Sequence, residues 1–242
     1  MRSKYILGLF LCFMTSISFA TSIDGIKPTL QYDEEYLNNA NVKTFNASYL
    51  NFVLEGYKFP SKTKTGKRQL AKFEKALEIM EEVMNSEEFR TKVISYKRAS
   101  NGKREYQKNF LWKDSEITFT NEEIYQIIMN GDEKMRPNTI GEMNFNSRVR
   151  VCRWNTSPMR WKWCQSVVGS TTPASSKMIT LNWKFYKKFE VNQMVANMVH
   201  EWLHLLGFLH GKKHMREEVP YVVGTIAGEV AKGIMEGENN LY

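Results

Sequence analysis

Residues 199–210, which read VHEWLHLLGFLH, constrain the fold more than any other segment of the 242-residue chain. They contain three of its four histidines. His200 and His204 are four residues apart, so on a helix both imidazoles project from one face, one turn apart. Apolar residues recur at helical spacing before and within the segment, as Val191, Val195, Met198, Trp202, Leu205 and Leu206. The pattern predicts a helix with an apolar stripe, and Asn192 is its expected N-cap.

The histidine spacing also suits a metal site. Gly207 can adopt a positive φ, end the helix and redirect the chain, so that His210 returns toward the other two imidazoles. Three protein ligands leave the fourth position of a zinc ion for water or substrate, whereas a structural zinc site takes four protein ligands. A fourth ligand is offered nearby only by His214, in a lysine-rich stretch. We therefore expect one catalytic Zn²⁺ ion on three histidines, with Glu201 beside it as the general base.

The stretch HEWLHLLGFLHG resembles the long zinc-binding motif of the metzincin clan of zinc metallopeptidases, which includes the astacins and matrixins. The resemblance implies that the zinc ligands are His200, His204 and His210, and that Glu201 is the base. It also implies a single α+β domain with a small mixed sheet, an active-site helix and a C-terminal helix. In the clan an exposed antiparallel edge strand precedes the active-site helix and binds extended peptide, and residues 176–182 lie where that strand would be. The substrate-binding residues implied in this way are Met178, Ile179, Thr180 and Leu181.

After the third histidine the chain departs from the metzincin pattern. Members of the clan have a tight turn with a methionine beneath the metal, often with a tyrosine two residues on, before a final helix. Here Ile226, Val230 and Ile234 have the spacing of that final helix. The resemblance then puts Val219 in the place of the methionine and Tyr221 in that of the tyrosine. Tyr221 is either an ordinary packed aromatic or a hydrogen-bond donor to an oxyanion.

The first twenty residues have the pattern of a cleaved secretory signal peptide. Arg2 and Lys4 precede an apolar run over residues 5–14, and residues 18–20 (SFA) suit a signal peptidase. The run is too short to span a membrane, and no later stretch is long and apolar enough. We therefore expect an exported protein, secreted or periplasmic, without a membrane anchor.

The remaining patterns predict one domain after an N-terminal extension. Residues 21–65 read as an extended arm or a short pro-segment, and residues 66–242 as the metallopeptidase domain. Helices are expected over residues 69–84, from an N-cap at Ser86, and over residues 121–129; strands are expected over residues 148–154, 159–168 and 176–183. Cys152 and Cys164 are the two cysteines left after signal cleavage, so a disulfide that closes a hairpin between them is expected.

These features together predict a zinc-dependent endopeptidase. The expected substrate is protein or peptide, including the peptides of a cell wall, and the expected state is a monomer. The net charge of +8 and the alternating tryptophans and basic residues over 153–163 do not predict a nucleic-acid partner, because inward packing of the tryptophans also explains that segment. Two alternatives stay open. Glu229 could replace His210 as the third ligand, or the protein could be a non-catalytic exported zinc-containing binding protein for cell-wall or surface polymers.

Overall fold

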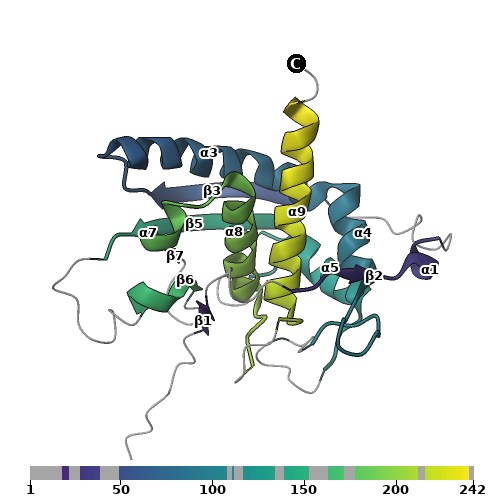
Figure 1. The fold of residues 1–242 in the computed structure, drawn as a ribbon. Helices are drawn as coiled ribbons and strands as arrows, with labels where there is room; N and C mark the ends of the chain where they lie inside the picture. The colour runs from purple at the N-terminus through teal and green to yellow at the C-terminus, as the bar shows by residue number, and fades with distance from the viewer. Residues whose placement is uncertain are drawn as a thin grey trace, which may run out of the picture.

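The structure is a computed structural model that describes residues 18–21, 28–38, 49–107, 111, 117–133, 139–152, 163–171, 178–211 and 216–239 (Figure 1). The strands are β1 (Ser18–Thr21), β2 (Gln31–Tyr32), β3 (Asn51–Lys58), β4 (Tyr96–Lys97), β5 (Glu142–Arg150), β6 (Val167–Thr171) and β7 (Ile179–Asn182). The helices are α1 (Glu34–Leu37), α3 (Lys64–Asn85), α4 (Glu87–Ser95), α5 (Asn121–Asn130), α7 (Trp183–Tyr186), α8 (Val191–Leu206) and α9 (Val219–Asn239). Within these ranges no helix is long and apolar enough to cross a membrane.

A five-stranded mixed sheet has the strand order β1-β6-β7-β5-β3. β3, β5 and β7 run parallel to one another, while β6 is antiparallel to β7 and β1 is antiparallel to β6. In Figure 1 the strands descend from β3 to β1, α3 runs along β3, and α8 and α9 pack against each other. The arrangement confirms the expected α+β class with a small mixed sheet and a C-terminal helix.

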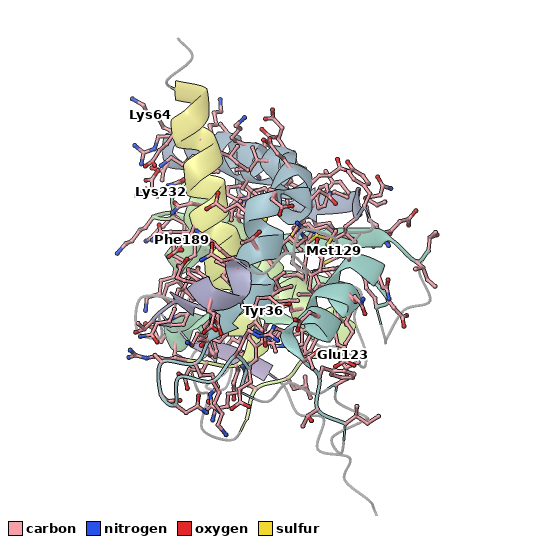
Figure 2. The ribbon with its side chains drawn as sticks, turned by 90° about the vertical axis from the view of Figure 1, so that its right-hand side faces the viewer. Tyr36, Lys64, Glu123, Met129, Phe189 and Lys232 are labelled. Carbon is pink, nitrogen blue, oxygen red and sulfur yellow. A yellow bond between two sulfur atoms is a disulfide. The ribbon has the colours of Figure 1, made fainter. Side chains whose placement is uncertain are left out.

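The three helices expected before the histidine motif are present, and their first turns are capped. Thr63 accepts a backbone hydrogen bond at the start of α3, and Ser86 does so at the start of α4, as predicted. α5 begins with a reciprocal capping box between Thr120 and Glu123. Figure 2 shows this side of the molecule, where the labels of Glu123 and Met129 mark the two ends of α5. Local sequence therefore explains where these helices begin.

The expectation of an exposed edge strand at residues 176–182 is wrong. β7 lies inside the sheet, with β5 on one side and β6 on the other. Ile179, Thr180 and Leu181 are all buried, and the Thr180 hydroxyl accepts a hydrogen bond from the Arg148 guanidinium at 3.1 Å. Met178, just before β7, is half-buried. All four residues of β7 are buried, which is typical of the middle of a sheet, so these residues offer no free strand edge to a peptide.

The disulfide is confirmed, but the hairpin is not. Cys152 and Cys164 are bonded, with their Cα atoms 6.1 Å apart. The strands on either side of the bridge, β5 and β6, are not neighbours, because β7 lies between them. Residues 163–166 are helical, and residues 153–162, with most of the expected hairpin, lie outside the described residues. The bridge therefore ties together two segments that lead into non-adjacent strands.

Part of the expected N-terminal arm belongs to the domain. β3 pairs with β5 in parallel register from Asn51 with Glu142 to Lys58 with Arg148, and it forms one edge of the sheet. Its backbone also contacts α3, since the Leu50 amide donates to the Asn85 side chain at 2.8 Å. The sheet therefore includes residues on both sides of the boundary expected at residue 65.

Glycines allow α8 and α9 to approach closely. A Cβ atom added to Gly224 would lie 2.7 Å from the Ala196 carbonyl oxygen and 3.0 Å from the Cβ of His200. One added to Gly228 would lie 2.8 Å from the Ala196 Cβ and 2.9 Å from the Asn192 carbonyl oxygen. These contacts leave no room for side chains, so the small residues of α9 set the distance between its axis and the histidine-bearing helix.

Candidate metal centre

The first two histidines project from α8, which is buried along most of its length. His204 is fully buried and His200 is 4% exposed. The helix begins at Val191, so Asn192 lies within its first turn and the N-cap is Glu190; the prediction of an Asn192 cap is wrong. The Glu190 amide donates instead to the Gln193 side chain at 3.0 Å.

Gly207 ends the helix in the way that the sequence predicts. Its φ of 104° lies in the left-handed region, and its amide donates to the His204 carbonyl oxygen at 3.1 Å. The next amide, of Phe208, donates to the Leu203 carbonyl oxygen at 3.2 Å. This turn reverses the chain and brings His210 back beside α8.

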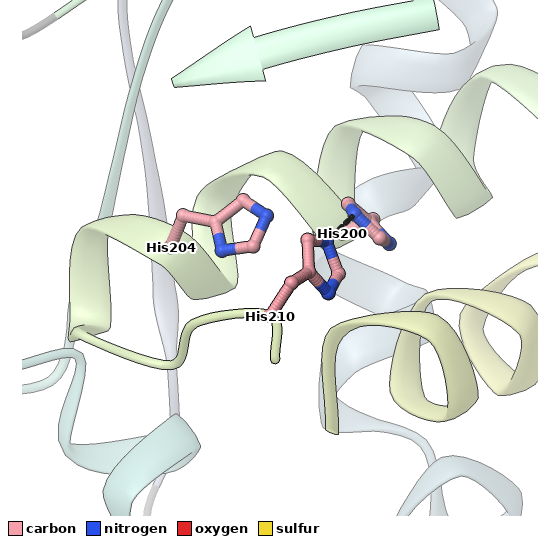
Figure 3. A group of neighbouring side chains, drawn as sticks. All are labelled: His200, His204 and His210. Atoms are coloured by element: carbon pink, nitrogen blue, oxygen red, sulfur yellow. Dashed lines mark hydrogen bonds between the residues drawn. The ribbon is translucent and has the colours of Figure 1, made fainter. Parts of the chain in front are cut away.

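The three imidazoles converge, as Figure 3 shows for His200, His204 and His210. The Nε2 atoms of His200 and His210 are 3.1 Å apart, and one ring nitrogen from each of the three residues lies within 4.8 Å of the others. A tetrahedral ion with Zn–N bonds of about 2.0–2.1 Å separates its ligand atoms by roughly 3.4 Å. The cluster is therefore compact enough to bind a metal ion.

The outer ring nitrogens of two histidines have acceptors that define their tautomers. The Nδ1 atom of His204 lies 2.6 Å from the Phe208 carbonyl oxygen, and that of His210 lies 2.8 Å from Oε2 of Glu218. A carbonyl and a carboxylate can only accept, so each Nδ1 carries the proton and donates it. In this tautomer the lone pair of each ring is on Nε2, as it must be for Nε2 to act as a metal ligand.

Glu201 follows His200 on α8 and is fully buried. Its Oε2 atom lies 3.0 Å from the Thr171 hydroxyl, and among the described residues no donor reaches its Oε1 atom. Burial raises the pKa of Glu201 to about 8, and the hydrogen bond from Thr171 opposes that rise. A buried carboxylate oxygen without a donor is costly, so the site fits a group that would supply a cation or a proton there.

β6 is the strand next to Glu201. Thr171 at its end holds the carboxylate, and a Cβ atom added to Gly169 would lie 2.5 Å from the Oε1 atom of Glu201. The other edge of β6 pairs antiparallel with β1, with Ser18 opposite Thr171 and Phe19 opposite Ser170. The strand beside the expected base is therefore β6 and not residues 178–181.

Tyr221 lies against the histidines, within the first turn of α9. Its ring stacks on that of His210, with centroids 4.5 Å apart and an angle of 28° between the planes, and it meets His200 edge-on at 4.8 Å. Val219 is buried and is the first residue of α9, so the final helix begins seven residues before Ile226. The two positions taken from the resemblance thus lie in the helix itself rather than in a turn before it.

The alternative ligand Glu229 does not join the cluster. Glu229 lies on α9 and forms an ion pair with Lys92, with an N–O distance of 3.6 Å. The group of potential ligand atoms contains only the three predicted histidines among the described residues. His214 lies outside those residues.

Sequence reasoning missed three residues of the site: Gly169, Thr171 and Glu218. Each contacts the motif from a distant or non-helical segment, and none belongs to a recognisable spacing pattern. Glu218 is fully buried, and besides His210 it holds the Gly211 amide, whose nitrogen lies 2.8 Å from Oε1. A glutamate beside Glu217 in a charged stretch gives no sign of such burial.

Comparisons with known proteins do not assign the chain to a family. No protein-family model matches it, and neither curated proteins nor solved structures include a significant match. The metzincin resemblance therefore rests on residues 199–211 and on the geometry that they adopt.

Proposed function

We propose that the protein is an exported zinc-dependent peptidase of the metzincin type. The observation that carries the proposal is the convergence of three histidine nitrogens, with a buried glutamate, Glu201, next to His200 in the sequence. Three imidazoles suit Zn²⁺ among the metals that proteins bind, and a site with three protein ligands is the catalytic type. The disulfide and the predicted signal peptide support export to an oxidising compartment, secreted or periplasmic.

His200, His204 and His210 would hold the ion. A bound zinc ion supplies Lewis-acid chemistry, which polarises a carbonyl and makes water acidic enough to lose a proton near neutral pH. Glu201 accepts that proton and later delivers it to the nitrogen of the leaving amine. The Thr171 hydroxyl, 3.0 Å from Oε2, holds the carboxylate in place and leaves Oε1 for the proton.

Tyr221 is the proposed hydrogen-bond donor to the oxygen on which charge develops. Its ring lies against two of the three histidines, and it is 4% exposed. A hydrogen-bond donor that is already in position stabilises the transition state most where charge develops in a site from which water is excluded. A Tyr221→Phe protein tests this role apart from packing, because it keeps the ring and removes only the hydroxyl.

The proposed position for an extended peptide substrate is the edge of β6 that β1 occupies in the structure. Residues 18–20 of β1 belong to the predicted signal peptide, so its cleavage would leave that edge open. An extended segment of the chain itself, β1, pairs antiparallel with this edge. β6 also carries Gly169 and Thr171, which contact Glu201, so a strand paired to it lies next to the proposed base. Backbone hydrogen bonds would hold such a peptide, and side-chain pockets would select it.

The test combines metal analysis with hydrolysis assays. We expect about one zinc ion per chain and chelator-sensitive cleavage of at least one substrate among casein, gelatin and purified cell-wall material. Glu201→Gln keeps the size of the side chain and is expected to retain zinc while losing about 100- to 10,000-fold in kcat. Zinc binding with no hydrolysis of any substrate would favour the non-catalytic binding protein. A Glu201→Gln protein as active as the parent would refute the mechanism.

A further inference from the structure

We propose that Glu218 is a positioning residue that holds His210 ready to bind the metal, and that residues 98–107 hold Glu218 in place. The inference deepens the proposed function, because it concerns the third ligand of the same site. It rests on a buried carboxylate whose role the histidine motif does not explain.

Glu218 holds the ring of His210 from the side opposite the other histidines. Its carboxylate is fully buried, with Oε2 2.8 Å from His210 Nδ1 and Oε1 2.8 Å from the Gly211 amide nitrogen. The Nε2 atom of His210 faces His200, 3.1 Å from the Nε2 atom of that residue. One carboxylate therefore sets both the tautomer of the ring and the position of the backbone that follows it.

His210 needs this support more than the other two ligands do. His200 and His204 project from α8, whose backbone fixes their spacing. His210 lies beyond Gly207 and outside any helix or strand, so no repeating backbone hydrogen bonds fix the rotation of its ring. A side-chain partner on Nδ1 supplies that constraint at little entropic cost, because Glu218 is itself buried and held.

The backbone of Glu218 is attached to a segment more than a hundred residues earlier. Glu217, its neighbour, accepts hydrogen bonds from the Ser100 amide at 2.8 Å and from the Ser100 hydroxyl at 2.5 Å. Arg98 forms an ion pair with the same carboxylate at 3.3 Å, and the Gln107 amide donates to the Glu217 carbonyl oxygen at 2.9 Å. Glu217 thus binds the 98–107 segment, while Glu218 binds His210.

The chemistry of the site suggests a sharp substitution, Glu218→Gln. Both partners of the carboxylate, the Nδ1–H group of His210 and the Gly211 amide, are donors. A glutamine offers one acceptor oxygen and one NH₂ group, so one of the two donors is left facing another donor. Loss of such an outer partner typically lowers metal affinity 10- to 100-fold.

A matched control is Glu133→Gln. Glu133 is also buried, and its Oε1 atom accepts from the Asn144 amide at 3.2 Å and from the Trp202 indole at 2.9 Å. Neither of these hydrogen bonds involves one of the three histidines. The control therefore measures the effect of neutralising a buried carboxylate away from the ligands.

The experiment measures zinc affinity by competition with a chelator of known strength, on the full chain. We expect Glu218→Gln to bind zinc 10- to 100-fold more weakly than the parent, and Glu133→Gln to stay within about threefold. ¹⁵N NMR of the histidine side chains in the metal-free protein should show the Nδ1–H tautomer of His210 in the parent and in the control, with a mixture of tautomers in Glu218→Gln. Parent-like affinity and tautomer in Glu218→Gln would overturn the inference.

A second variant covers the case in which Glu218→Gln does not fold. Glu217→Ala removes a side chain that is 15% exposed and acts only through the attachment to residues 98–107. We expect zinc binding about 3- to 10-fold weaker, and unchanged affinity would overturn the inference. Zinc affinity and the histidine tautomer are both measured without hydrolysis. A parent protein that binds zinc and cleaves nothing would therefore refute the proposed function, while the affinity measurements would still test the role of Glu218.

Discussion

Gly169 is the residue of β6 that leaves room for the side chain of Glu201, and Gly169→Ala therefore tests the placement of the proposed base. The added Cβ atom would lie 2.5 Å from Oε1 and 2.8 Å from both Cδ and Cγ of Glu201. Ordinary contacts between such atoms are about 3.5 Å, so the carboxylate must move by about 1 Å. Because Cγ is in the way as well, a rotation of the carboxylate alone cannot relieve the contact.

The shift is expected to affect catalysis far more than binding of the metal. A misplacement of about 1 Å at a reacting group costs on the order of 100-fold in rate, or about 2.7 kcal/mol in activation free energy. Overpacking of a buried site lowers the free energy of unfolding by about 1–3 kcal/mol. Zinc affinity should stay within about threefold of the parent value, because Glu201 is not one of the three ligands.

The assay is kcat/KM on a substrate that the parent cleaves, with zinc content and urea unfolding measured on the same samples. Gly233→Ala is the matched control, since a Cβ atom on this helical glycine meets nothing closer than 3.8 Å. It should raise stability by up to about 1 kcal/mol and leave activity unchanged. A Gly169→Ala protein with full activity would refute the assignment of Glu201 as the base. A Gly169→Ala protein that has lost its zinc would refute the prediction that moving Glu201 leaves metal binding unchanged.

Three further predictions concern the metal, the helix packing and the disulfide. Removal of zinc with a chelator should lower Tm, since a ligand at about 1,000 times its Kd stabilises the folded state by about 4 kcal/mol; calorimetry that shows the same Tm before and after removal would contradict a structural contribution of the ion. Gly224→Ala should destabilise the metal-free protein by about 1–3 kcal/mol and weaken zinc binding, because its Cβ atom would meet a backbone oxygen at 2.7 Å and His200 at 3.0 Å. A variant with the same free energy of unfolding and the same zinc affinity as the parent would contradict this prediction. Replacing Cys152 and Cys164 by serine should lower the free energy of unfolding by about 3 kcal/mol for a loop of this length. Urea unfolding under non-reducing conditions measures this loss, and no loss would contradict the prediction.

Local sequence predicts the part of the site that lies within one segment. The helix, the glycine that ends it and the three histidines all belong to residues 191–210, where spacing along the chain determines spacing in space. Ser86 as an N-cap is predicted for the same reason, since its partner is the amide of Phe89, three residues on. Asn192 is the local exception, because the helix begins two residues earlier than the cap preference of asparagine suggests.

Strand order is what the sequence cannot reveal here. Residues 178–182 read as a strand, and a strand forms, but whether it lies at an edge depends on which segments pair with it. The pairing of β3 with β5 joins residues about ninety positions apart. Alternation within a segment predicts which of its side chains face the core, but it does not predict which other strand lies beside it.

Three segments of the chain contribute to the site, and only the histidine segment has a pattern that the sequence reveals. α8 and the turn at Gly207 bring the histidines together, β6 holds the carboxylate of Glu201 through Thr171, and residues 98–107 hold Glu218 through Glu217. The last two supports act on different residues, one on Glu201 and the other on His210. In the proposed mechanism metal affinity and proton transfer therefore depend on different contacts: the histidine motif provides the ligands, while contacts from distant segments hold the third ligand and the proposed base.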